Sequence, residues 1–223
     1  MGETILKLTP FIIGSAVVPL QLMMIILLLN SPRQGLAKAI CLVAGMTAIR
    51  LLQGIILGLI LAPSSQDSSG KSPVVSTLLL VLGILLLITA YRQWRNEDDP
   101  DGPPPKWLSM LDSLSPIKTF GLGMGLVLIS GKFWVFTMSV IGVIEEAQLG
   151  QPSSSVAFLL FVLLAQSLLL IAISVRVIIP EQSKIIMETI SVWLNKYNRT
   201  IMMVVSFVFG LLFLVQGVSG LLE

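Results

Sequence analysis

Six stretches of mostly apolar residues divide the chain, and each is long enough to cross a lipid bilayer as a helix. A membrane-spanning helix needs about 20 such residues. Only 12% of the 223 residues are charged, about half the share found in soluble domains, so the bilayer must be the solvent for much of the surface. The six predicted spans cover residues 8–29, 36–61, 74–91, 118–143, 156–179 and 200–221.

The six spans group into two halves of three. Similar apolar runs around Gly83 in the third span and Gly210 in the sixth close the two halves. Because each half has an odd number of spans, the halves must lie in opposite orientations, as in many transporters. We therefore predict an all-α, polytopic membrane protein whose six transmembrane helices form two inverted three-helix repeats. Its parts are a first membrane repeat at 1–91, a cytoplasmic Pro-rich linker at 92–117 and a second membrane repeat at 118–223.

The distribution of Lys and Arg predicts the orientation in the membrane. Nine of the fourteen fall in the loops after spans one, three and five, and two fall on the opposite side. Cytoplasmic loops carry the excess of these residues. We expect a multi-pass protein of the bacterial inner membrane with both termini outside. The first apolar run exceeds the roughly 7–15 residues of a signal-peptide core, so it is interpreted as a span.

Two segments of the predicted cytoplasmic loops have one apolar stripe each. The segment at 106–114 has apolar residues at helical spacing, including Trp107 and Leu114, and the segment at 186–197 has Ile190 and Trp193. Both patterns are typical of helices that lie in the headgroup layer. They are equally typical of helices that pack on the rest of the protein, and both interpretations stay open.

Three cations fall inside the predicted spans. Arg176 is near the predicted cytoplasmic end of the fifth span, so its side chain is expected to extend to the membrane surface. Arg50 and Lys132 lie near the middle of their spans, where burying a cation costs at least about 2.5–3.5 kcal/mol. None of the twelve acidic residues is mid-span. Backbone carbonyls and water could satisfy the two cations, or an anionic ligand could, and we favour the ligand.

Residues that interrupt helices occur at matching places in the first and fourth spans. The first span has Gly14 and Pro19, and the fourth has Ser130 and Gly131 directly before Lys132. Gly and Pro at equivalent places in two halves predict discontinuous helices at a binding site. The candidate substrate-binding residues are Lys132, Arg50, Gly131, Ser130, Pro19, Gln21 and Gln53.

Helix packing is the expected role of most other small and polar residues in the spans. Gly121 and Gly125 form a GxxxG motif, as do Gly54 and Gly58, and such motifs predict close contact between helices. Single polar residues are expected to make interhelical hydrogen bonds, although they could also line a path. These residues are Gln21, Thr47, Gln53, Thr137, Gln166 and Ser167.

The chain lacks the residues that most catalytic chemistry needs. There is no histidine, which removes the commonest general base and transition-metal ligand, and Cys41 is the single cysteine. No nucleotide-binding loop is present. Ser130 and Lys132 are the remaining nucleophile and base, and at i, i+2 they face apart on a regular helix. We therefore expect no enzymatic activity, no metal and no cofactor.

Short motifs along nearly the whole chain resemble one protein family. They are Asn30-Ser31-Pro32-Arg33 after the first span, Tyr91-Arg92-Gln93-Trp94-Arg95 after the third, Pro105-Lys106-Trp107 through Leu111-Asp112 to Phe120-Gly121-Leu122-Gly123, and Trp193-Leu194 with Asn198 before the sixth. Their order and spacing are similar to those of the GAP family of peptidoglycolipid- or sulfolipid-addressing proteins, within the LysE superfamily of exporters.

The resemblance implies six spans in two inverted halves, and export of small molecules or movement of envelope glycolipids. The superfamily often has an Asn-Pro-Lys break in its fourth span. Here the matching residues are Ser130-Gly131-Lys132, so the lysine is kept and the Asn and Pro are not. The broken helix is still expected, since Gly also permits it, whereas coordination through an Asn is not.

Three functions are left open, with membrane lipids as expected partners and no nucleic acid. The first is export of an anionic or polar lipid, and the second is export of a small carboxylate resembling an amino acid. A lateral apolar groove would favour the first, and a closed polar cavity would favour the second. The third is a membrane scaffold that does not transport and acts through its Pro-rich linker and the cytoplasmic amphipathic helices. The protein could act as a monomer or as a homodimer.

Overall fold

Each predicted span coincides with one helix or with one bent pair of helices. The computed structural model describes residues 2–61, 73–95 and 111–222, and within these ranges it contains helices and turns without a strand. These ranges contain three helices that are long and apolar enough to cross a membrane by themselves, and three bent pairs that pass the same test as pairs. The single helices are α3 (Gly35–Leu61), α4 (Pro73–Arg95) and α10 (Pro180–Leu222).

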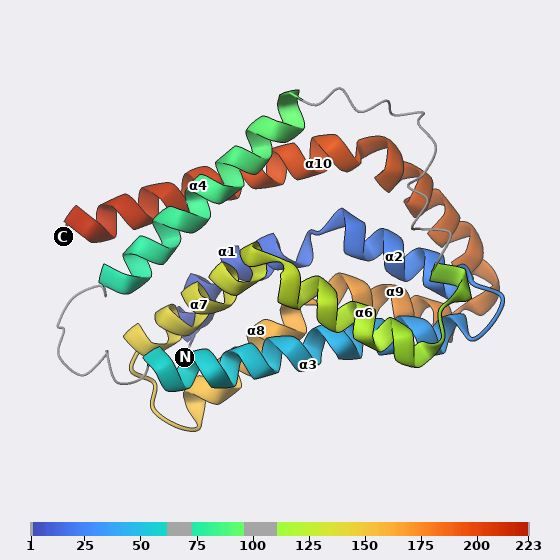
Figure 1. Cartoon of the computed structure of the whole chain (residues 1–223), viewed down its shortest axis with the longest axis horizontal. Helices are drawn as coiled ribbons and strands as arrows, with labels where there is room; N and C mark the ends of the chain where they lie inside the picture. The colour runs from blue at the N-terminus through green and yellow to red at the C-terminus, as the bar shows by residue number, and fades with distance from the viewer. Residues whose placement is uncertain (1, 62–72, 96–110, 223) are drawn as a thin grey trace.

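The helices at the first, fourth and fifth predicted spans form pairs that are each bent near the middle. Figure 1 shows the three bends at about the same level along the long axis of the bundle. The pairs are α1 (Gly2–Ala16) with α2 (Pro19–Asn30), bent by 56°; α6 (Pro116–Ile129) with α7 (Gly131–Glu146), bent by 71°; and α8 (Ser153–Ala165) with α9 (Ser167–Ile178), bent by 59°.

Local sequence accounts for two of the three bends. Val18 is extended (φ −121°, ψ 94°) because the Pro19 ring disfavours the helical conformation in the preceding residue. Ser130 is also extended (φ −80°, ψ 102°), at the break predicted for the fourth span. The bend at Gln166 is not among those predicted, because no glycine or proline marks it.

Helices α4 and α10 cross so closely that only glycine fits at the contact. A Cβ atom on Gly83 would lie 2.6 Å from the Leu214 backbone nitrogen and 2.9 Å from the Gly210 carbonyl oxygen. A Cβ on Gly217 would lie 2.6 Å from the Leu80 backbone nitrogen. The pair runs along one side of the other helices (Figure 1). Gly83 and Gly210, which occupy equivalent places in the similar apolar runs of the third and sixth predicted spans, therefore contact each other.

Helices α3 and α6 form a second close crossing, at glycines other than those predicted. Cβ atoms on Gly45 and Gly123 would overlap the carbonyl oxygens of the facing helix. The predicted GxxxG glycines Gly121 and Gly125 meet nothing within 4 Å, so that packing prediction is wrong. GxxxG spacing identifies residues on one face of a helix, and here the neighbour lies against the other face.

The second GxxxG motif also fails to bring two backbones together. Gly54 faces the ring of Phe158, and nothing lies within 4 Å of a Cβ on Gly58. These two glycines leave space for an aromatic side chain and for a surface hollow, described below.

Helix α10 contains both the predicted amphipathic segment and the sixth span in one continuous element. Met187 and Leu194 of this segment are buried in the core, whereas Ile190 and Trp193 are exposed. The predicted stripe is thus divided, because Leu194 packs on the bundle while Ile190 and Trp193 stay exposed. The other predicted amphipathic helix, at 106–114, falls mostly outside the described residues, which include the turn η2 (Leu111–Ser113).

The buried apolar side chains form two clusters, one on each side of the bends. The first cluster takes its residues mainly from α2, the first half of α3, α9 and the start of α10. The second takes them mainly from α1, α4, α7, α8 and the end of α10. In the second cluster the ring of Phe213 stacks on Phe11 at 4.8 Å and meets Phe136 edge-on at 5.8 Å.

Candidate functional site

A layer of polar side chains separates the two apolar clusters, at the level of the bends. A buried polar residue inside a membrane protein is costly, so such residues commonly mark pathways or binding sites. Along three spans, a polar residue falls between neighbours from opposite clusters: Ser15 between Phe11 and Val18, Arg50 between Ile49 and Leu51, and Gln166 between Ala165 and Leu169.

Arg50 is buried in this layer with only 3% of its surface exposed. Its guanidinium carbon lies 5.0 Å from the centroid of the Phe133 ring, a cation–π contact at the first turn of α7. Within the described residues, its Nε atom has no hydrogen-bond partner and no acidic side chain forms an ion pair with it. The cation is therefore only partly satisfied, and an anion could complete its coordination.

Two interhelical hydrogen bonds flank Arg50 on the same face of α3. One turn before it, Gln166 Nε2 donates to Thr47 Oγ1 at 2.9 Å and so connects α3 to the bend of the fifth span. One turn after it, the Thr137 hydroxyl of α7 lies 3.3 Å from Gln53 Oε1. These bonds confirm the interhelical role predicted for Thr47, Gln53, Thr137 and Gln166. Gln53 Nε2 is buried without a partner in the described residues.

The bends bring the N-termini of short helices to the level of Arg50. Helices α2, α7 and α9 begin at Pro19, Gly131 and Ser167. The first turn of a helix carries N–H groups without intrahelical partners and a partial positive charge, and both features favour anions. At Gly14, one turn before the first bend, a Cβ atom would lie 3.3 Å from the Phe136 ring of α7, so the first and fourth spans are in contact there.

The remaining predicted site residues occupy the bends themselves. Pro19 is the first residue of α2 and is buried, as is Gln21. Ser130 precedes α7 and its side chain makes no capping hydrogen bond. Gly131 is exposed, with open space where a side chain would lie. Lys132 belongs to the first turn of α7, and its side chain lies outside the described part of the structure.

Some residues at the site were not predicted. Phe133 supplies the ring beneath Arg50, and Trp134 Nε1 donates to the Leu128 carbonyl at 2.9 Å, which satisfies a backbone group that the bend leaves free. Ser15 and Ser139 are buried with hydroxyl groups that have no partner in the described residues. Aromatic and serine residues are too common in membrane helices for the sequence to have distinguished these four.

Two other cations have structural roles. Arg176 donates from Nη1 to the Pro180 carbonyl and to Ser183 Oγ, each at 3.0 Å, so it fastens the α9–α10 corner. Its side chain thus extends toward the predicted cytoplasmic end of the fifth span, and its reach to the membrane surface stays a prediction. Lys38, predicted as a loop cation, is buried and donates to Ser31 Oγ at 3.1 Å.

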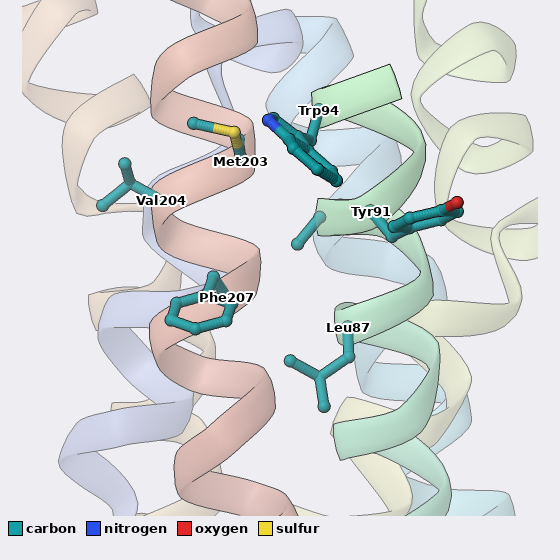
Figure 2. Close-up of a pocket in the computed structure, with 7 residues that line it drawn as sticks. Leu87, Tyr91, Trp94, Met203, Val204 and Phe207 are labelled. Atoms are coloured by element: carbon teal, nitrogen blue, oxygen red, sulfur yellow. The ribbon is translucent and has the colours of Figure 1, made fainter. Parts of the chain in front are cut away.

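An apolar groove opens between α4 and α10 near the C-terminal end of α4 (Figure 2). Its volume is about 370 Å³, at the low end of the roughly 300–1,000 Å³ of small-molecule sites. Tyr91, Trp94 and Phe207 on its walls are each more than half exposed, so the groove opens sideways. Its lining consists of Leu87, Ala90, Tyr91, Trp94, Met203, Val204 and Phe207.

A second hollow, of about 480 Å³, lies between α3, α7 and α8. Gly54, which faces the Phe158 ring, and Gly58, which has open space beside it, line its apolar part. Polar residues also line it, and they are Glu145, Gln151, Ser154 and Ser155. In the described residues, no group of three or more His, Cys, Asp or Glu side chains could hold a metal ion.

The apolar helices and bent pairs define a helical, multi-pass membrane protein. A family model described as Sap, sulfolipid-1-addressing protein, matches residues 8–219. The chain therefore belongs to the sulfolipid-1-addressing protein family, as the motif resemblance predicted. No curated protein and no solved structure matches the chain.

Proposed function

We propose that the protein exports an anionic or polar lipid, with Arg50 as the group that recognises the negative charge. The observation that carries this proposal is the buried guanidinium with an unpaired Nε at the level of three helix bends. Helices α2, α7 and α9 begin at the same level, and discontinuous helices of this kind present N-termini to anionic substrate groups in transporters. Lys132, in the first turn of α7, is a second candidate ligand for the anion.

The lateral groove supports a lipid over a small carboxylate as the substrate. It lies between two apolar helices and its walls are exposed toward the bilayer, which suits an acyl chain. The groove is lined by α4 and α10 alone, so it supports affinity for lipid chains, while the headgroup of the exported lipid would separately cross the polar layer of Thr47, Arg50 and Gln53. Transport by this route needs no covalent chemistry, so we propose a transporter and not an enzyme.

The proposed transport unit consists of two inverted three-helix halves. Two features support it. The first span of each half is bent at its middle, at Val18 and at Ser130. The third span of each half crosses the other at Gly83 and Gly210, and contact between equivalent residues is what a two-fold relation predicts. We further propose an inner-membrane location with both termini outside, on the basis of the Lys and Arg distribution.

Lipids that remain bound during extraction test the anion site. The full chain is extracted into native-membrane nanodiscs as wild type, Arg50→Gln and Lys132→Gln, and the lipids are measured by mass spectrometry. Wild type is expected to enrich an anionic lipid. In Arg50→Gln this enrichment should fall roughly tenfold or more, because a hydrogen bond to a charged group contributes about 1.5–3 kcal/mol to binding. Arg33→Gln, at an exposed loop cation, is the control. Wild-type lipid identical to bulk membrane would contradict the proposal.

A further inference from the structure

We propose that the groove between α4 and α10 binds an acyl chain of an anionic phospholipid, with the phosphate at the cationic rim formed by Arg92, Arg95 and Lys196. This site is separate from the polar layer around Arg50. The inference does not rest on transport, because occupancy of the groove can be measured in a protein that lacks Arg50.

The groove is held open at both ends. At one end α4 and α10 are in backbone contact at Gly83 and Gly210. At the other, Arg199 of α10 donates to the last carbonyls of α4, from Nε to Gln93 O at 2.7 Å and from Nη2 to Trp94 O at 2.8 Å. These two contacts fix the positions of α4 and α10 on either side of the groove. The groove is therefore preformed, and a ligand need not push the helices apart.

The shape and lining of the groove suit a hydrocarbon chain. Figure 2 shows Leu87 and Phe207 facing each other across it, with Trp94 and Met203 closer to the C-terminal end of α4. From Leu87 to Trp94 a helix rises roughly 10 Å, enough for part of one acyl chain. Every lining side chain is apolar or aromatic, so a headgroup cannot lie inside the groove without losing its hydrogen bonds.

Aromatic residues mark the depth at which the headgroup would lie. Tyr91 and Trp94 of α4 have ring centroids 6.1 Å apart, and Trp193 and Tyr197 of α10 have centroids 5.5 Å apart. All four are exposed. Trp and Tyr concentrate at the membrane–water interface, so this end of the groove is expected at headgroup level, in the leaflet that the sequence assigns to the cytoplasmic side.

The charges in the last turn of α4 and in the facing turn of α10 are positive. In the last turn of α4 they are Arg92 and Arg95, both exposed. In the facing turn of α10 they are Lys196, which is exposed, and Arg199, which is already bonded to α4. The phosphate of a lipid whose chain lies in the groove would therefore meet cations. Glu97, Asp98 and Asp99 follow in the sequence and lie outside the described residues. The experiment below therefore measures the net preference of this end for an anionic over a zwitterionic headgroup.

Photo-crosslinking with a defined lipid tests this proposal. The full chain is placed in nanodiscs containing phosphatidylglycerol with a diazirine in its acyl chain, irradiated, and mapped by peptide mass spectrometry. Labelling of wild type and of Arg50→Gln is expected to concentrate at 87–94 and 203–207. Val204→Trp adds a large ring at the α10 wall of the groove. It is expected to reduce the labelling roughly tenfold, which corresponds to the loss of about two buried methylene contacts.

A matched control lies one turn away on the same helix. Val208 is as exposed as Val204 but does not line the groove, so Val208→Trp should leave the labelling unchanged. Arg92→Gln combined with Arg95→Gln should remove the preference for phosphatidylglycerol over phosphatidylcholine. Labelling spread evenly over the lipid-facing surface in wild type, equal loss in both Trp variants, or no wild-type preference between the two headgroups would each overturn the assignment.

Discussion

Arg50→Met is expected to keep or raise the thermal stability of the protein while abolishing lipid export. A buried cation without full compensation is costly, and replacing buried charges by apolar residues of similar volume is often neutral or stabilising, by about 1–4 kcal/mol. Arg50 has an unpaired Nε, and no described acid forms an ion pair with it. Methionine fills much of the same volume and is flexible enough to pack beside Phe133.

Arg176→Met is the matched control for this experiment. The Arg176 guanidinium makes two hydrogen bonds of 3.0 Å to α10, so its loss is expected to destabilise the protein by about 1–3 kcal/mol. Thermal unfolding in one detergent, with export measured in parallel, compares the two variants. If Arg50→Met were destabilised as much as Arg176→Met and still exported lipid, Arg50 would be a structural residue and the proposed anion site would be wrong.

Gly123→Ala is expected to be the most damaging single-methyl substitution in α6. Its new Cβ would overlap the Leu42 carbonyl oxygen of α3, and backbone cannot move aside as a flexible side chain can. Overpacking of this kind costs about 1–3 kcal/mol, and occasionally more. The thermal midpoint and the monodisperse yield in detergent should both fall.

Gly121→Ala, two residues earlier on the same helix, should not lower the thermal stability of the protein. Open space surrounds Gly121, and alanine is favoured over glycine within a helix by up to about 1 kcal/mol. The midpoint of this variant should be unchanged or higher. Equal losses at both positions would mean that the α3–α6 crossing is not the one described here.

Apolar periodicity and helix-breaking residues were sufficient to predict the positions of the apolar helices and two of the three bends. Pro19 restricts the residue before it by local sterics alone, so its effect is visible in the sequence. The bend at Gln166 has no such local cause. Its amide instead donates to Thr47 on α3, a contact between residues 119 positions apart, which no local pattern can reveal.

The glycines illustrate the same limit. Sequence spacing places Gly121 and Gly125 on one face of α6, but it does not say which face meets another helix. Gly123, on a different face, makes the close contact. Likewise Lys38 was assigned to a loop, whereas the turn before α3 folds back and brings Ser31 within 3.1 Å of its ammonium group.

Part of the candidate site was predictable and part was not. Arg50 was identified because a mid-span cation without an acid is unusual in any membrane helix. Its position between two apolar clusters, and the ring of Phe133 beneath it, depend on how α3 packs against α7. That packing is set by tertiary contacts, which explains why Gln53 was selected for its polarity but Phe133 was not.

Lipid translocation in proteoliposomes tests the central claim most directly. The full chain is reconstituted with fluorescent phosphatidylglycerol, under an imposed membrane potential and proton gradient, and the appearance of the lipid in the opposite leaflet is followed. Wild type and Arg33→Gln are expected to move the anionic lipid, and Arg50→Gln to move it at least about tenfold more slowly. An Arg50→Gln rate equal to wild type, or a wild-type rate equal to that of protein-free liposomes, would contradict export through an anion site at Arg50.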